Sequence, residues 1–142
     1  MRKPEILSPA GDFTCLQAAL DAGLEWKSAY VIEADPSDKP LFARLMRGRN
    51  ARDAFVCRND PTAARLIETL AELKVKVPQS VHVAGFDDGE TARLANPPLT
   101  TIHQPVKTLG GIAVASLLQR IRNPSFAPRS ILLDAPLVVR GS

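Results

Sequence analysis

Aromatic residues are few in this sequence of 142 residues, and neither sign of charge is in large excess. One Trp and one Tyr are too few to build the aromatic surface on which single-stranded nucleic acids stack. The 18 Lys and Arg side chains are nearly balanced by 15 Asp and Glu, which leaves a net charge of +3. Because duplex DNA is held by clustered positive charge, we do not expect this chain to bind DNA by itself.

Metal ligands and catalytic motifs are scarce as well. The two cysteines, Cys15 and Cys57, and the two histidines, His82 and His103, lie far apart and show none of the usual spacings of a tetrahedral metal site. No serine lies in a nucleophile-elbow motif, and no glycine-rich cofactor loop is present. We therefore expect no metal, no cofactor and no enzymatic activity.

Long apolar runs are also absent. No segment approaches the roughly 18 consecutive apolar residues of a transmembrane helix, and the start of the sequence lacks the pattern of a secretion signal. Neither cysteine belongs to a CxxC pair, so we expect both to be buried, reduced and structural. These features predict a cytoplasmic protein that does not contact membranes.

The sequence does contain an alternation of β-rich and helical segments. This order predicts an α/β fold with an open, mostly parallel sheet flanked by helices. The β-rich runs lie at residues 29–33, 53–57, 81–86, 99–103, 131–133 and 137–139, and the helical patterns at 13–22, from 38 onward, from 60 to before 77–78, and at 105–122.

Some details of the helices can be predicted from their ends and faces. In the helix that begins near residue 60, one face carries apolar residues at helical spacing, namely Ala63, Leu66, Ile67, Leu70 and Leu73. Gly23 suits the left-handed residue that ends a helix, and Asp60 with Pro61 suits a helix N-cap and first turn. Helix 105–122 has one apolar face, which predicts that this face is buried. The members of that face are Val106, Leu109, Ala113, Leu117 and Ile121.

Three polar groups follow predicted strands, where open parallel sheets bind their ligands. They are Arg58–Asp60, Asp87–Asp88 and Gln104. The amide of Asn59 offers both a donor and an acceptor to sugar hydroxyls, and paired carboxylates can accept hydrogen bonds from vicinal hydroxyls. These residues alone leave open whether Asp87–Asp88 binds a ligand or forms an exposed turn, and Asp60 suits a helix cap better than a ligand contact.

Several ordered motifs carry a family resemblance over residues 29–142. They are Asp53–Asp60 (DAFVCRND), Val77–Pro78, Val81–Asp88 (VHVAGFDD), Pro98–Pro105 (PLTTIHQP), Leu109–Gly110 and Leu137–Arg140 (LVVR). In this order and spacing they resemble the effector-binding domain of LacI/GalR-family transcription regulators. The resemblance implies one lobe of a periplasmic-binding-protein-like (type I) fold, which closes with a second lobe on a small effector, often a sugar or a purine.

The resemblance also implies a division of the chain. Residues 29–104 would form the C-terminal lobe, 105–122 the crossover helix belonging to the N-terminal lobe, and 129–142 the returning strands. The sequence lacks the family's DNA-binding domain and nearly all of its N-terminal lobe. The resemblance further implies a homodimer, which would contact operator DNA only through a domain absent from this chain.

Effector contacts follow from the resemblance residue by residue. Asn59 and Asp87 would line the effector cleft, and Gln104 would lie where the chain crosses between the lobes. Asp88 and Asp35 are further candidates, the latter because the loop after strand 29–33 often borders the ligand. The arginine that the family usually carries at the start of the first helix has no counterpart near Asp12.

Residues 1–28 are an atypical start for this family. Residues 2–23, which include Arg2–Asp12, Ala18–Ala19 and Ala22–Gly23, resemble the amino terminus of collagenase-like peptidases. Two alternatives to a regulator therefore remain, a solute-binding protein of a transporter and a truncated collagenase-like peptidase fragment.

Overall fold

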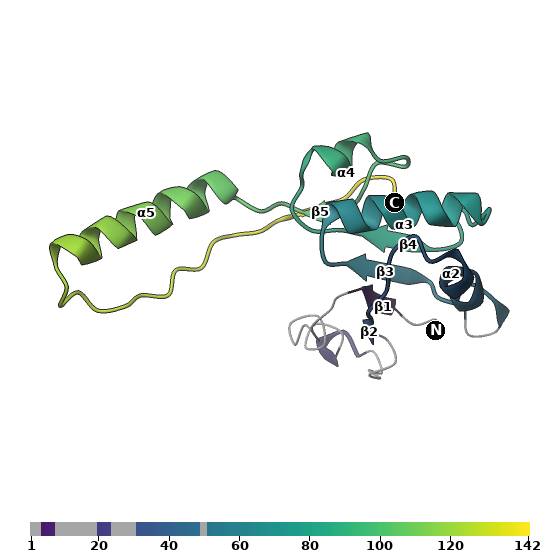
Figure 1. Ribbon diagram of the computed structural model, residues 1–142, viewed down its shortest axis with the longest axis horizontal. Helices are drawn as coiled ribbons and strands as arrows, with labels where there is room; N and C mark the ends of the chain where they lie inside the picture. The colour runs from purple at the N-terminus through teal and green to yellow at the C-terminus, as the bar shows by residue number, and fades with distance from the viewer. Residues whose placement is uncertain (1–3, 8–19, 24–30, 49–50) are drawn as a thin grey trace.

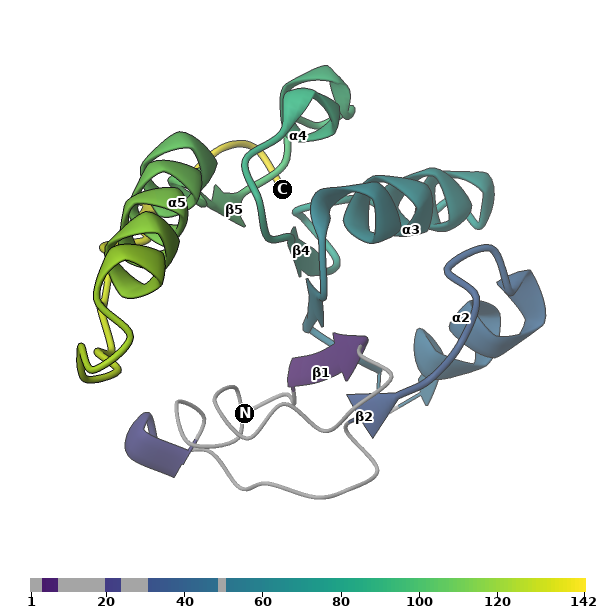
Figure 2. The ribbon, with the colours of Figure 1, turned by 60° about the vertical axis from the view of Figure 1, so that its left-hand side comes forward.

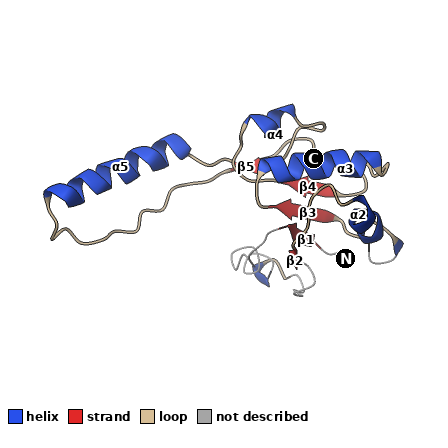
Figure 3. Cartoon of the chain, viewed as in Figure 1, coloured by secondary structure: helices blue, strands red, loops and turns tan. Residues whose placement is uncertain are grey.

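The computed structural model describes residues 4–7, 20–23, 31–48 and 51–142, which form a lobe and a long arm that projects from it (Figure 1). The lobe contains the parallel strands and most of the helices, whereas the arm consists of one helix and an extended connector (Figure 3). Most of the helix predicted at 13–22 lies outside the described residues. Gly23 has a φ of 72°, the left-handed conformation predicted for it.

The lobe is built on a four-stranded parallel sheet with the strand order β2-β1-β3-β4. The strands are β1 (Pro4–Leu7), β2 (Val31–Ile32), β3 (Ala54–Cys57) and β4 (His82–Ala84). This arrangement confirms the predicted open parallel sheet and three of its strands. Strand β1 was not predicted; it pairs with both β2 and β3 and lies within the segment considered an atypical start.

Helices α2 (Lys39–Leu45) and α3 (Asp60–Glu72) lie side by side next to the sheet (Figure 2). Asp38 begins α2 because its carboxylate accepts a hydrogen bond from the N–H of Leu41 over 3.0 Å. The ring of Phe42 packs edge-on against that of Phe55 on β3, with 5.7 Å between centroids. From α3 the buried face comprises Ala63, Leu66, Ile67 and Leu70, as the periodicity predicts.

Cys57 ends β3 inside this core, as expected for a structural cysteine. Burial raises the pKa of its thiol to about 12, so the reactive thiolate is scarce at neutral pH. The other cysteine, Cys15, lies outside the described residues.

The chain leaves and re-enters the lobe through a two-stranded antiparallel sheet formed by β5 (Thr101–Ile102) and β6 (Leu137–Val138). Both strands were predicted. Residues 131–133 form no strand, so that prediction is wrong. They run through the connector of the arm, where no described strand edge lies beside them to complete a ladder (Figure 1).

Helix α5 (Val106–Arg122) forms the arm and closely matches the predicted range. Its apolar face is exposed, contrary to prediction: Leu117 is 60% and Ile121 is 66% solvent-exposed. Periodicity identifies the apolar face of a helix but not the surface that covers it, and no described residue of α5 is buried.

Among the described residues, no helix combines the length and apolar character needed to cross a membrane.

Candidate functional site

The loops that follow β3 and β4 meet at the carboxyl edge of the parallel sheet. The N–H of Asp60 donates to the carbonyl of Phe86 over 2.9 Å, which joins the two loops directly. Asn59 is the N-cap of α3, since its Oδ1 accepts from the N–H of Thr62 over 3.1 Å. The cap predicted at Asp60 is therefore one residue too late, and Asp60 is the first helical residue.

Asp60 has a different role, because its carboxylate is buried and holds this edge together. The residue is 1% exposed. One oxygen accepts from the hydroxyl of Thr101 over 2.5 Å and the other from the N–H of Gly89 over 2.8 Å. These bonds tie the start of α3 to β5 and to the segment before α4 (Glu90–Leu94). Asn and Asp are comparable N-caps, so propensity does not decide between Asn59 and Asp60. Buried donors select Asp60 as the residue whose side chain points into the lobe.

The β4–α4 loop (Gly85–Gly89) begins with a close approach of backbone to side chain. A Cβ atom on Gly85 would collide with the carboxylate of Asp60 and lie 2.8 Å from the side chain of Leu99. The N–H of Gly85 also donates to the carbonyl of Thr100 over 2.9 Å. Only glycine lets the loop lie this close to α3 and to the segment leading into β5.

Asp87 lies between the β4–α4 loop and the segment after β5. Its N–H donates to the carbonyl of Ile102 over 3.0 Å, and its carbonyl accepts from the N–H of Gln104 over 3.3 Å. Its φ is 117°, a left-handed value that few non-glycine residues adopt. Burial, and secondarily the negative charge of Asp60, raises the pKa of the Asp87 carboxyl. A half-buried carboxylate with strained backbone geometry is typical of a functional position.

The carboxylate of Asp88 is already occupied by protein groups. Arg140 donates to one oxygen over 2.5 Å, the Nδ1 of His103 lies 3.0 Å from the other, and a nitrogen of Arg93 lies 3.8 Å away. Only 8% of its side chain is exposed. The hydrogen bond from Arg140, followed by that from His103, lowers the pKa of this carboxyl.

The candidate Asp35 lies in the loop after β2. Its carboxylate accepts from the N–H and hydroxyl of Ser37, over 2.8 and 2.5 Å, and these bonds lower its pKa, with the hydroxyl contributing most. Strand β1 stands between β2 and β3, so this loop is two strands away from that of Asn59.

Three of the predicted contacts are therefore brought to one edge of the sheet. Asn59 adjoins the bond between Asp60 and Phe86, and Asp87 is bonded to Gln104. Thr101 and Arg140 were not predicted as site residues, although both lie in motifs that carried the resemblance. A side chain's distant partner leaves no local pattern, so spacing alone would not have found them.

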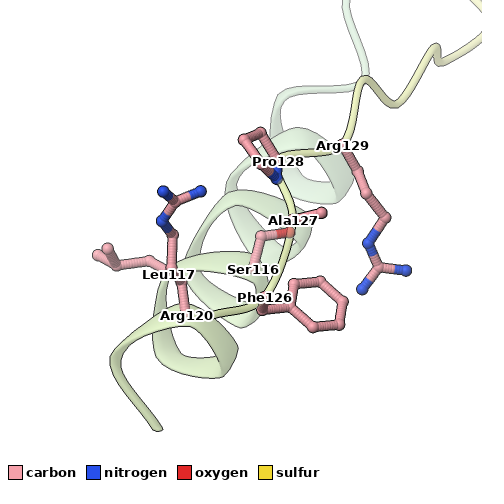
Figure 4. A pocket seen from close by; sticks show the side chains of 7 residues that line it. All are labelled: Ser116, Leu117, Arg120, Phe126, Ala127, Pro128 and Arg129. Atoms are coloured by element: carbon pink, nitrogen blue, oxygen red, sulfur yellow. The ribbon is translucent and has the colours of Figure 1, made fainter. Parts of the chain in front are cut away.

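Hollows also exist elsewhere on the molecule. Figure 4 shows one of about 250 Å³ on the arm, between α5 and the connector, where Arg129 lies over the ring of Phe126 at 4.3 Å. It is lined by apolar groups, Ser116 and two arginines and contains no carboxylate, so it suits a hydroxyl-rich ligand less well than the sheet edge. The described residues contain no group of three His, Cys, Asp or Glu side chains suited to a metal ion.

Comparisons with known proteins agree with this architecture. Residues 13–142 match the family model of the periplasmic binding protein-like domain. The ribose operon repressor of Haemophilus influenzae is 39% identical over 89 residues, which cover 63% of this chain and 27% of the repressor. The solved transcriptional regulator CelR in complex with cellobiose has a TM-score of 0.84 at 25% identity, covering 99% of this chain and 46% of its own. A LacI-type transcription regulator from Bifidobacterium animalis has a TM-score of 0.80 at 27% identity, covering 99% of this chain and 58% of its own.

The chain is shorter than these proteins. It spans 26 to 39% of the length of the curated relatives it matches. These relatives are transcription regulators, so the comparison identifies a family of binding domains and not of enzymes. The chain belongs to the periplasmic binding protein-like domain family, in the form that LacI/GalR-family regulators use as their effector domain.

Proposed function

We propose that the chain supplies one wall of an effector cleft that takes a sugar or a related polyhydroxyl compound. The observation that carries the proposal is the position of Asp87 at the carboxyl edge of the sheet, bonded through its backbone to Gln104. Ligands of open parallel sheets bind at this edge. The CelR structure, whose fold covers nearly the whole chain, contains cellobiose.

Asp87 would be the main polar contact. A carboxylate can accept hydrogen bonds from two adjacent hydroxyls of one sugar, and bonds to a charged acceptor are stronger than neutral ones. Burial makes the charged form of Asp87 costly, and the pKa of its carboxyl is raised as a result. Hydroxyl donors from an effector would replace the lost water and favour the ionised carboxylate.

Asn59 and Gln104 would complete this wall. Oδ1 of Asn59 accepts the capping bond from Thr62, which leaves the amide NH₂ as the group offered to a hydroxyl oxygen. Gln104 follows β5, where the chain begins to leave the lobe. An effector that contacts both Asp87 and Gln104 would therefore contact the lobe and the segment through which the chain leaves it.

We assign the arm to the second lobe of the complete sensor. Residues 105–122 would be the crossover helix belonging to the N-terminal lobe, and residues 129–142 would return to the C-terminal lobe of residues 29–104. The exposed apolar face of α5 supports this division, since such a face is stable in water when another surface covers it. The matching solved chains are about twice as long as this one, which would leave room for such a lobe.

In the complete protein, closure of two lobes on the effector would shift the balance between open and closed arrangements. That shift would alter how a homodimer presents a DNA-binding domain, located outside this chain, to operator DNA. The relatives are transcription regulators, which supports a role in the cytoplasm.

The proposal can be tested on the chain itself by NMR titration with D-ribose, cellobiose and sucrose. Saturable shifts are expected at the amides of residues 58–60, 86–89 and 103–105 with at least one sugar. Dissociation constants on the order of millimolar are expected, because one wall supplies only part of the binding energy. Saturable shifts confined to the arm hollow, or no saturable shift with any of the sugars, would contradict the proposal.

Asp87→Asn is the matching variant, since it removes the charge and replaces one acceptor with a donor. It should weaken the affinity for the sugar by roughly tenfold or more, consistent with about 1.5–3 kcal/mol for a hydrogen bond to a charged group. Asp134→Asn is the control, because Asp134 is an exposed carboxylate on the arm. Equal effects of the two substitutions would show that Asp87 has no special role.

A further inference from the structure

The C-terminal residues of the chain are bonded to the strands of the lobe. The backbone N–H of Arg140 donates to the hydroxyl of Thr100 over 3.0 Å, and the N–H of Gly141 donates to the carbonyl of Pro98 over 2.9 Å. The hydroxyl of Ser142 donates to the carbonyl of Val83 over 2.6 Å and accepts from the N–H of Thr100 over 2.8 Å.

The guanidinium of Arg140 joins this segment to the β4–α4 loop. Nη1 donates to the carbonyl of Leu99 over 2.9 Å, while Nη2 donates to the carboxylate of Asp88 over 2.5 Å. Only 18% of the Arg140 side chain is exposed. The planar group therefore spans two segments that lie 11 positions apart in the sequence, which a single ammonium group would not do as well.

The second oxygen of Asp88 extends the connection to the outgoing strand. Nδ1 of His103 lies 3.0 Å from it, and the N–H of His103 donates to the carbonyl of Pro136 over 2.9 Å. Asp88 is thus bonded to residues on both segments of the crossing, which we define as residues 102–105 going out and 136–140 coming back. Its neighbour Asp87 is bonded to the outgoing segment through its own backbone.

We propose that Arg140 latches the β4–α4 loop to the crossing through Asp88, so that the latch fixes where Asp87 and Gln104 are presented. Asp88 is then a positioning residue rather than an effector contact, because both of its oxygens are engaged by the protein. The consequence for effector binding rests on the proposed function. The latch itself is a property of the lobe and can be measured without any ligand.

Amide hydrogen exchange of the chain without ligand tests the latch. In Arg140→Gln, exchange at the amides of Asp87, His103 and Gln104 should rise by roughly tenfold or more, because these bonds open when the loop separates from the crossing. The amides of Leu66 and Leu70 on α3 should keep their protection. Arg140→Lys should give an intermediate rise, since it retains the charge but cannot reproduce both guanidinium contacts.

Arg93→Gln is the matched control. It also removes a positive charge near Asp88, but a nitrogen of Arg93 lies 3.8 Å from the carboxylate and 63% of the Arg93 side chain is exposed. NMR titration of the Asp88 carboxyl gives a second readout: Arg140→Gln should raise its pKa more than Arg93→Gln does. The other ionisable groups facing this carboxyl are His103 and Arg93, and both are present in the Arg140 variant.

Non-additivity separates a latch from a general loss of stability. In an Asp88→Asn background, Arg140→Gln should produce little further rise in exchange at Asp87, because the connection is already broken. A uniform rise across α3 as well, equal effects of Arg93→Gln, or additive effects in the double variant would overturn the latch. None of these measurements uses a sugar, so their failure is distinct from the failure of the proposed function.

Discussion

The hydroxyl of Thr101 donates a hydrogen bond of 2.5 Å to the carboxylate of Asp60, and both residues are almost fully buried. This bond joins the first turn of α3 to β5, the strand through which the chain leaves the lobe. The other oxygen of Asp60 binds the N–H of Gly89. A single buried carboxylate therefore sets the distance between the helix, the β4–α4 loop and the crossing.

Thr101→Val should lower the free energy of unfolding by about 1–3 kcal/mol. Valine has a similar shape but no hydroxyl, so a buried charged oxygen of Asp60 loses its donor. Urea unfolding followed by circular dichroism measures the change. Thr108→Val on exposed α5 is the control, and it should shift stability by less than about 0.5 kcal/mol. Equal effects at the two positions would contradict the role given to Thr101.

Gly85→Ala should destabilise the lobe by about 1–3 kcal/mol, because the added methyl group has no room beside Asp60 and Leu99. Gly110→Ala is the matched substitution, since nothing lies within 4 Å of its added Cβ atom. It should stabilise α5 by up to about 1 kcal/mol, through the higher helix propensity of alanine. The two substitutions should shift the melting temperature in opposite directions. A stabilising Gly85→Ala would contradict the close packing of Gly85 against Asp60 and Leu99.

The sequence predicted the parts of the fold that depend on local pattern. A continuous apolar run that ends at Cys57 favours a buried strand, and apolar residues at helical spacing favour the helix α3. Both elements appear as predicted. The strand at 131–133 and the buried face of α5 depend on a surface elsewhere in space. A local sequence pattern does not reveal which surface covers a strand or a helix face, so these two predictions failed.

The candidate site shows the same division. Asn59, Asp87 and Gln104 follow strands, so their meeting at one edge could be expected from the order of the elements. The partners of Asp60 and Asp88 could not. Thr101 and Arg140 lie 41 and 52 positions away from them, and only the folded chain brings such residues together.

The arm should cause the chain to self-associate in solution. Its apolar side chains are exposed over several turns of α5, and surfaces of this kind bind one another in water. Sedimentation velocity should detect oligomers that disappear in the double variant Leu117→Glu and Ile121→Lys. Because both residues are exposed, unfolding of the lobe should change by less than about 0.5 kcal/mol. Lys107→Glu is the polar control, and if it dissociates the oligomers equally, their association does not depend on the apolar face.

Sugar binding should weaken as the pH falls through the pKa of Asp87. Burial, and then the charge of Asp60, raises that pKa above its ordinary value of 3.8, whereas hydroxyl donors from a sugar favour the ionised form and lower it. Binding therefore releases protons between the two pKa values. Affinity should be constant above the higher value, drop by up to about tenfold per pH unit between the two values, and level off below the lower one. NMR titrations at a series of pH values measure this dependence. Asp87→Asn should bind weakly at every pH, and a pH dependence that survives this substitution would assign the proton to another group.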